Sequence, residues 1–203
     1  MPQHPDRFYP IVDSLAWIGR LVRLGVGTVQ LRAKDLSPDA ALTLVREAVA
    51  LTRGTRTELI VNDYWRAAIA AGARHVHLGQ EDLAEADVAA IRAAGLTLGL
   101  STHDDDELAT ALRQRPDYVA LGPIYPTTLK AMRFGPQGLE RIGQWKRRIG
   151  TTPLVAIGGI TLERAPGAFA AGADCIAVVS DVTQSADPDK RVRDWLETTD
   201  MIE

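Results

Sequence analysis

The sequence has almost no cysteine: Cys175 is the only one in 203 residues. A single thiol excludes a disulfide within the chain and is typical of a reducing compartment. By position, Cys175 falls in an apolar strand and is expected to be a small buried core residue. The sequence also has no large excess of charge, since the formal net charge is −3. It therefore gives no electrostatic reason to expect a nucleic acid or an anionic membrane as a partner.

Long apolar segments are absent as well. No run of about 18 apolar residues occurs, so no transmembrane helix is expected. Residues 1–7 show no apolar signal region. From these two absences we expect a cytoplasmic protein.

Strand-like and helix-like patterns alternate along the whole chain. Short apolar runs predict eight strands, at 8–12, 28–32, 58–62, 75–79, 97–101, 118–124, 153–160 and 175–180. Stretches rich in Ala, Leu, Arg and Glu predict helices between and after them, at 15–24, 38–52, 64–71, 83–94, 104–115, 139–149, 162–171 and 188–196. Glycines that follow four of these helices predict left-handed C-caps, and Ser37 and Asp187, each before a proline, predict N-caps.

Eight such units predict an α/β fold, a single (β/α)8 TIM barrel over residues 1–203. The alternative is an open doubly wound sheet, which usually has a glycine-rich turn after its first strand. Here the first predicted strand is followed by Asp13, Ser14 and Leu15, with no glycine. The barrel is therefore the favoured architecture.

Polar side chains follow several of the predicted strands, where the loops of a barrel carry catalytic residues. Arg32 and Lys34 can bind phosphate oxygens, and Asp63 and Asp82 offer hard oxygen ligands to Mg²⁺. Either aspartate alone would more often be a helix N-cap. Because we place both on adjacent strands beside Arg32 and Lys34, a metal-assisted diphosphate site is favoured. Its predicted residues also include Gln30, Asn62 and Ser101.

A second phosphate site is predicted at the last two strands. Gly158 and Gly159 end one apolar strand, and Val179 and Ser180 end the next. Barrels often bind phosphate there through backbone N–H groups, and glycine permits a close approach of the anion. Two phosphorylated substrates, or one bisphosphate, would follow.

The histidines give weaker signals. His75 and His77 lie within a predicted strand and are expected to be core residues. His103, just after the fifth strand, could either cap the next helix or line the site. No Ser-His or Cys-His arrangement for nucleophilic catalysis is apparent.

Taken together, these motifs resemble thiamine phosphate synthases, which are (β/α)8 barrels. The matching residues span nearly the whole chain in one order: 8–13, 30–34, 62–63, 77–82, 101–103, 122–127, 130, 136–139, 156–160 and 179–180. The resemblance implies a Mg²⁺-dependent transferase of thiamine biosynthesis. Such enzymes join a hydroxymethylpyrimidine diphosphate to a thiazole phosphate, or its carboxylated form, and release pyrophosphate and thiamine monophosphate.

The resemblance also implies residue roles. Arg32, Lys34 and Lys130 would be catalytic, and Asp63 and Asp82 would bind Mg²⁺. The pyrimidine diphosphate would contact Gln30, Leu31, Arg32, Ala33, Lys34, Asn62, Ser101 and Lys130. The thiazole phosphate would contact Thr127, Thr128, Leu129, Gly159, Val179 and Ser180. The implied partners are two small phosphorylated substrates, with no nucleic acid or membrane; homo-oligomers are an open alternative.

One departure from the family pattern stands after strand six. The family usually has Thr-x-Thr-Lys, whereas this chain has Leu129 before Lys130. Leucine cannot donate a hydroxyl hydrogen bond, so Thr128 or backbone groups would have to replace it. Two rivals remain: a thiazole tautomerase, which would need neither the diphosphate clamp nor both acids, and a catalytically silent phosphate-binding barrel.

Overall fold

A closed ring of eight parallel strands forms the centre of the computed structural model, which describes residues 5–127 and 134–201. Each strand pairs with the next, and β1 also pairs with β8. The strands are β1 (Phe8–Val12), β2 (Thr28–Leu31), β3 (Glu58–Asn62), β4 (His75–Leu78), β5 (Thr97–Thr102), β6 (Tyr118–Leu121), β7 (Leu154–Ile157) and β8 (Cys175–Val178). The predicted (β/α)8 barrel is confirmed.

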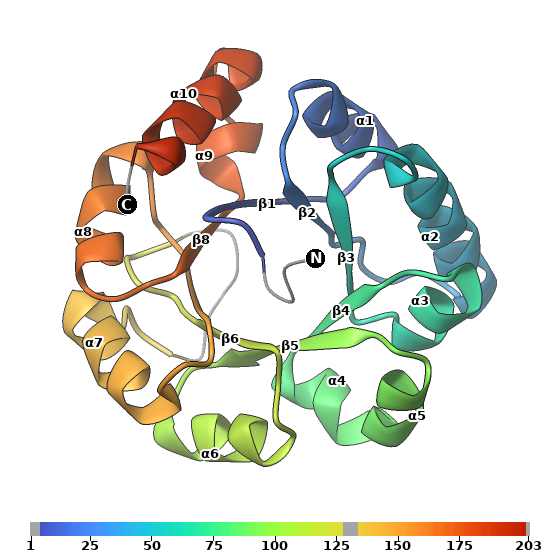
Figure 1. Cartoon of the computed structure of the whole chain (residues 1–203), viewed down its shortest axis with the longest axis horizontal. Coiled ribbons are helices and arrows are strands. Elements are labelled where there is room, and N and C mark those ends of the chain that lie inside the picture. Colours follow the sequence, from blue (N-terminus) through green and yellow to red (C-terminus); the bar gives the residue numbers. More distant parts are fainter. Residues whose placement is uncertain (1–4, 128–133, 202–203) are drawn as a thin grey trace.

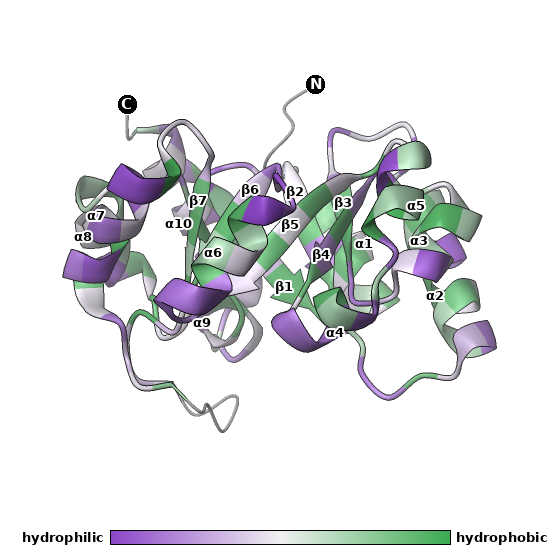
Figure 2. Cartoon of the chain, turned by 90° about the horizontal axis from the view of Figure 1, so that it is seen from below, coloured by the Kyte–Doolittle hydropathy of each residue, from purple (hydrophilic) through white to green (hydrophobic). Residues whose placement is uncertain are grey.

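Helices surround this ring (Figure 1). They are α1 (Leu15–Arg23), α2 (Pro38–Thr52), α3 (Trp65–Ala71), α4 (Gln80–Glu85), α5 (Val88–Ala93), α6 (Asp105–Arg113), α7 (Gly138–Ile149), the 3₁₀ turn η1 (Leu162–Arg164), α8 (Ala165–Ala170), α9 (Ser180–Thr183) and α10 (Pro188–Asp200). Figure 2 shows hydrophobic strands inside and hydrophilic stretches on the outer helices. In the described part of the chain, no helix is both long and apolar enough to span a bilayer.

Side chains on each strand alternate between two cores. The outer core lies between strands and helices and includes Leu31 and Trp145. The inner core fills the barrel and includes Tyr9, Tyr118 and Cys175. The sequence-based expectation for Cys175 is confirmed, since it is fully buried. The same alternation turns Gln30 inward and Leu31 outward, which decides what each can contact.

Several predicted segments were wrong in their boundaries. The predicted strand 118–124 ends at Leu121, and the predicted helix 162–171 begins as the 3₁₀ turn η1. The predicted helix 83–94 is two helices, because the side chain of Asp87 accepts a hydrogen bond from the N–H of Ala90 and starts α5 there. The predicted strand 153–160 ends at Ile157, since Gly158 and Gly159 turn to φ values of 95° and 65°. The predicted strand 175–180 ends at Val178, and residues 180–183 form α9 instead.

Helix ends were predicted better. Gly25, Gly72, Gly95 and Gly172 all have positive φ. Ser37 and Asp187 accept hydrogen bonds from backbone N–H groups three residues later. These ends are local features, which explains why the sequence alone reveals them.

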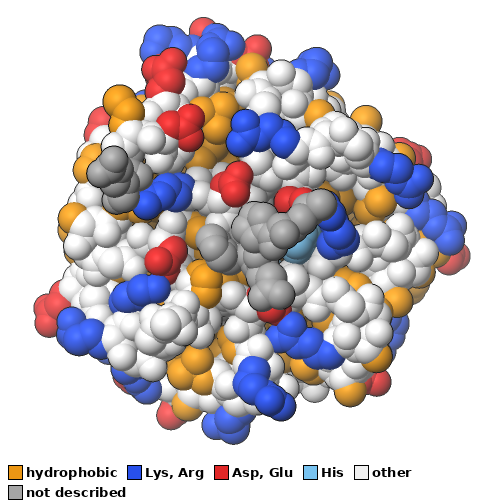
Figure 3. Space-filling model, viewed as in Figure 1, with side chains coloured by type: hydrophobic (Ala, Val, Ile, Leu, Met, Phe, Trp, Pro, Cys, Tyr) orange, Lys and Arg blue, Asp and Glu red, His pale blue; other side chains and the backbone are white. Residues whose placement is uncertain are grey.

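The termini lie on the face where the strands begin (Figures 1 and 2). Figure 3 shows this face, where basic and acidic side chains alternate around the rim rather than forming a patch of one sign. The connections that follow the strands lie at the opposite end of the barrel, and the cavities described next are built from them.

Candidate active site

A cavity of about 600 Å³ opens at the C-terminal ends of the strands. Most of the residues predicted for the diphosphate site line it: Gln30, Arg32, Lys34, Asn62, Asp63, Asp82 and Ser101. Two residues of the predicted set lie elsewhere. The side chain of Leu31 packs in the outer core, where it is 2% exposed, and neither Leu31 nor Ala33 lines the cavity. Successive side chains of an extended segment point to opposite sides, so Leu31 and Ala33 do not share the side of Gln30 and Arg32.

Asp63 and Asp82 form a carboxylate pair in this cavity. Asp63 follows β3 directly with φ of 63°, and its backbone N–H donates to the carbonyl of His77 (2.9 Å). Asp82 was predicted at the end of a strand, but it lies in the first turn of α4. Partial burial and the neighbouring charge of Asp63 raise the pKa of Asp82. A cation bound beside Asp82 and the Asp63 carboxylate would offset this unfavourable charge.

The donor set fits Mg²⁺. In residues 5–127 and 134–201, no group of three or more His, Cys, Asp or Glu side chains is placed to hold a metal. Among the described acidic side chains of the cavity, Asp63 and Asp82 are the pair that could hold a cation. Mg²⁺ commonly binds through one or two carboxylates and completes its shell with water and substrate phosphate. Lys34 forms an ion pair with Asp63, so the ammonium of Lys34 is in contact with the carboxylate pair.

A buried polar layer forms the floor of the cavity. The amide Nε2 of Gln30 donates to the hydroxyl of Tyr9 (2.6 Å), which lies 3.1 Å from the hydroxyl of Tyr118. That hydroxyl lies 2.9 Å from Nδ1 of His77, whose Nε2 lies 2.8 Å from Oγ of Ser101. His77 is a core histidine, as predicted, but it also lines the cavity.

Sequence analysis missed the two tyrosines and did not expect a Ser-His contact. The contact does not make an activated nucleophile, because the other imidazole nitrogen faces a phenol rather than a carboxylate. Burial also lowers the pKa of His77 to about 4, which makes it a weak base at neutral pH. The inward alternation of β1 and β6 is the signal that could have identified Tyr9 and Tyr118.

His103 lines the cavity and does not cap the next helix. Its ring lines the cavity and stacks on Phe134, with centroids 5.0 Å apart. The N-cap of α6 is Asp104, whose side chain accepts from the N–H of Glu107 (2.8 Å). Glu107 in turn accepts from the backbone N–H of His103 (2.8 Å) and contacts its Nδ1 (2.7 Å). This carboxylate therefore fixes the ring at the edge of the cavity.

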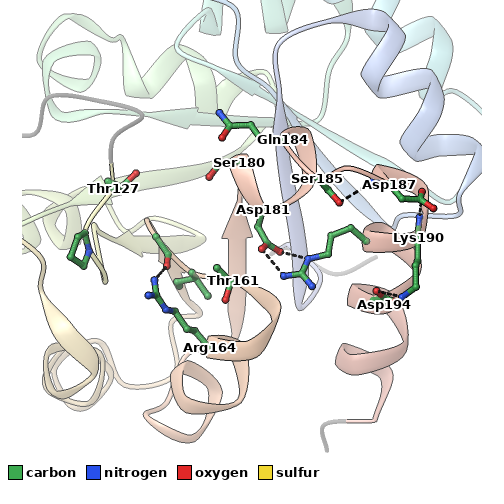
Figure 4. Close-up of a pocket in the computed structure, with 14 residues that line it drawn as sticks. Thr127, Thr161, Arg164, Ser180, Asp181, Gln184, Ser185, Asp187, Lys190 and Asp194 are labelled. Carbon is green, nitrogen blue, oxygen red and sulfur yellow. Dashed lines mark hydrogen bonds and ion pairs between the residues drawn. The ribbon is translucent and has the colours of Figure 1, made fainter.

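A second cavity, of about 620 Å³, lies beside β7 and β8 (Figure 4). Thr127, Gly159 and Ser180 line it as predicted, but Val179 does not. Arg164 was missed; it also lines the cavity, and its Nη1 donates to the carbonyl of Gly159 (2.6 Å). Thr128, Leu129 and Lys130 lie outside the described residues.

Asp181 anchors the wall next to Ser180. Its carboxylate accepts hydrogen bonds from Arg191 (2.7 and 3.0 Å) and from the indole of Trp195 (2.6 Å). Arg191 also pairs with Glu163 on η1 (2.9 and 3.1 Å). The first turn of α9 is thereby tied to α10 and η1, which holds Ser180 at the edge of the cavity (Figure 4).

Comparison with known proteins agrees with this geometry. Residues 7–182 match the model of the family described as thiamine monophosphate synthase. The chain is 57% identical to a thiamine-phosphate synthase of Rhizobium etli over 194 residues, which cover 96% of this chain and 95% of the relative. The chain belongs to the thiamine monophosphate synthase family. It is therefore an enzyme, a transferase of thiamine biosynthesis, and the family resemblance read from its motifs is confirmed.

Other relatives of this synthase family agree. A thiamine-phosphate synthase of Photorhabdus laumondii is 50% identical and covers 98% of this chain and 89% of its own length. Among solved structures, a thiamine phosphate pyrophosphorylase from Pyrococcus furiosus has a TM-score of 0.82 at 26% identity, covering 96% of this chain and 95% of that one. A 3-hexulose-6-phosphate synthase from Salmonella typhimurium, at 14% identity and a TM-score of 0.73, covers 97% of this chain and all of its own, and it shows only a shared fold.

Proposed function

We propose that this enzyme condenses 4-amino-2-methyl-5-hydroxymethylpyrimidine diphosphate with 4-methyl-5-(2-phosphoethyl)thiazole, or its carboxylated form, and that it requires Mg²⁺. The products are thiamine monophosphate and pyrophosphate, and the carboxylated form also loses its carboxylate as CO₂. The observation that carries this proposal is the pair of cavities at one end of the barrel. One holds two basic side chains and a carboxylate pair, and the other is built on Gly159 and Ser180.

The first cavity suits the diphosphate. Arg32 and Lys34 are two positions apart in the segment after β2. Their side chains therefore lie on the same side of the chain, and both face the cavity. The guanidinium offers several directed N–H donors, and the ammonium adds a compact charge. Asp63 and Asp82 would hold Mg²⁺, which supplies positive charge to the departing diphosphate when bound. Lys34 pairs with Asp63 in this structure and can turn from that carboxylate to a phosphate oxygen.

The second cavity suits the thiazole phosphate. Its lining includes Gly159, two residues after Ile157 of the first cavity, and its wall presents the hydroxyls of Thr127 and Ser180. Arg164 brings a guanidinium to the same edge, where its ring neighbour is Tyr125, 4.5 Å from the centroid. A phosphate bound here would leave the thiazole ring directed toward the barrel axis and the pyrimidine.

The reaction we propose is dissociative. The amino group of the pyrimidine releases electron density toward the methylene carbon as the C–O bond to the diphosphate breaks. The thiazole nitrogen then forms the new C–N bond to that carbon. This route needs no protein nucleophile. Cys175, for example, is buried and its thiol donates to the carbonyl of Pro5. The work of the protein is orientation and stabilisation of leaving-group charge.

The direct test is a turnover assay. Purified protein is mixed with both substrates and Mg²⁺, and thiamine monophosphate and pyrophosphate are measured together. We expect equimolar products, and none when either substrate is omitted or the metal is chelated. Running the thiazole phosphate and its carboxylated form in parallel identifies the accepted form. A protein that binds both substrates but releases neither product would contradict the proposal and favour a silent barrel.

A further inference from the structure

The buried layer under the first cavity is a continuous chain of five polar side chains. It runs from Gln30 on β2 through Tyr9, Tyr118 and His77 to Ser101 on β5, and each neighbouring pair is within hydrogen-bonding distance, 2.6–3.1 Å. The two ends, Gln30 and Ser101, line the cavity. Tyr9 and Tyr118 are 1% exposed, so solvent does not offer their hydroxyls other partners.

Counting protons gives this chain a direction. Gln30 donates to the Tyr9 oxygen, so the Tyr9 proton points to Tyr118. The Tyr118 proton then points to Nδ1 of His77. That nitrogen must accept, so the ring proton sits on Nε2 and points to Oγ of Ser101. The Ser101 proton is the one left over, and it is free to donate into the cavity.

The opposite direction requires a flipped amide. If Tyr118 donated to Tyr9, the Tyr9 oxygen would accept from both neighbours, and its own proton would have no partner among the described residues. Rotating the Gln30 amide so that Oε1 faces Tyr9 restores a full chain that runs from Ser101 to Gln30. Both directions use the neutral imidazole, whose single ring proton lies on Nε2 in the first direction and on Nδ1 in the second.

We infer that Tyr9, Tyr118 and His77 are positioning residues that couple the hydrogen-bonding sense of Gln30 and Ser101 across the cavity. When Gln30 presents its Oε1 acceptor, Ser101 presents a donor, and when one reverses the other must reverse as well. Both ends cannot act as acceptors, or both as donors, without leaving a buried group unpaired. An unpaired buried group of this kind disfavours the complex.

This inference rests on the proposed function and gives its pyrimidine specificity a structural cause. A 4-aminopyrimidine offers an N–H donor from its amino group and an acceptor at a ring nitrogen. It matches the structure as it stands, with the Gln30 acceptor at one end and the Ser101 donor at the other. The 4-oxo analogue replaces the amino donor by a carbonyl acceptor, and in its N3–H form the ring nitrogen beside that carbonyl becomes a donor. It therefore requires the reversed chain.

The test is a binding measurement rather than turnover. The 4-amino and 4-oxo pyrimidine diphosphates are titrated calorimetrically with Mg²⁺ and without thiazole phosphate. Because both ligands carry the same diphosphate, the ratio of their dissociation constants measures the difference in binding that is due to the ring. We expect the protein to favour the amino compound by about 10²-fold or more. Tyr118→Phe keeps the stacked ring but breaks the chain, and we expect it to bring the ratio below about tenfold.

Two further variants make the result decisive. Tyr9→Phe breaks the chain one position earlier and should also lower the ratio; it decides the matter if Tyr118→Phe does not fold. Thr199→Val removes a buried hydroxyl on α10, bonded to the carbonyl of Trp195 (2.9 Å), and should leave the ratio unchanged. If Tyr118→Phe folds and the ratio is unchanged, including the case in which both ligands bind equally more weakly, this inference is overturned but the proposed function is not. Failure of the unmodified protein to bind the amino compound would overturn the proposed function too.

Discussion

Gly159 offers a sharp test of how the second cavity is built. Its φ is 65°, in the left-handed region. A Cβ added there would lie 2.6 Å from the carbonyl oxygen of Pro126 and 2.8 and 2.9 Å from Cβ and O of Tyr125. These atoms belong to the loop after β6 rather than to the open cavity. The missing side chain therefore lets two loops pack together, and they in turn form the cavity edge.

Gly150 provides a matched control. Its φ is 63°, but a Cβ there would meet nothing within 4 Å. With ψ at −119°, Gly150→Ala should therefore cost only the strain of a backbone conformation that other residues rarely adopt, about 1–3 kcal/mol. Gly159→Ala adds contacts with backbone that cannot rotate away, worth about 1–3 kcal/mol more. For a chain of this length each kcal/mol lowers Tm by about 2–4 °C.

Calorimetry and steady-state kinetics measure both effects. Gly159→Ala should melt several degrees below Gly150→Ala and should raise KM for the thiazole phosphate. KM for the pyrimidine diphosphate should change much less. Gly150→Ala should leave both KM values unchanged. Equal Tm losses in the two variants, with the thiazole-phosphate KM intact in Gly159→Ala, would refute the loop-packing explanation.

Three further predictions concern the first cavity. Asp82→Asn should lower turnover by about 10²–10³-fold and abolish any rise of Tm on adding Mg²⁺; near-full activity with EDTA present would contradict the metal assignment. Arg32→Ala should weaken binding of the pyrimidine diphosphate in titrations while thiazole-phosphate binding stays nearly unchanged; equal losses would reject this division. Burial depresses the folded pKa of His77 to about 4, so its contribution to stability is present above the unfolded value near 6.5 and is lost as pH falls. His77 should therefore lower the free energy of unfolding, measured by urea titration, by about 2 kcal/mol between pH 6.5 and 5. His77→Gln should remove this contribution to the pH dependence of stability. His75, whose pKa burial also lowers, would keep a smaller slope in the variant.

Much of this protein could be predicted from local sequence. The alternation of apolar runs with amphipathic stretches identified the barrel, and the motif around Arg32 and Lys34 identified residues that line one cavity. The carboxylate pair was also predicted, although Asp82 lies in a helix turn rather than at a strand end. Strand and helix periodicity, capping residues and proline positions act over a few residues, so they can be read without knowing the fold.

Other features depended on contacts between distant residues. Tyr9 and Tyr118 are 109 positions apart, and only closure of the barrel brings their hydroxyls within 3.1 Å. The side of β2 that Leu31 occupies follows from which face the barrel encloses, since a period of two does not say which face is inside. Arg164 reaches the second cavity because η1 folds back over Gly159. The sequence by itself determined the architecture and the chemical types at the strand ends. The tertiary structure decided which of those groups share a hydrogen bond, because such pairing depends on positions in space that no local pattern encodes.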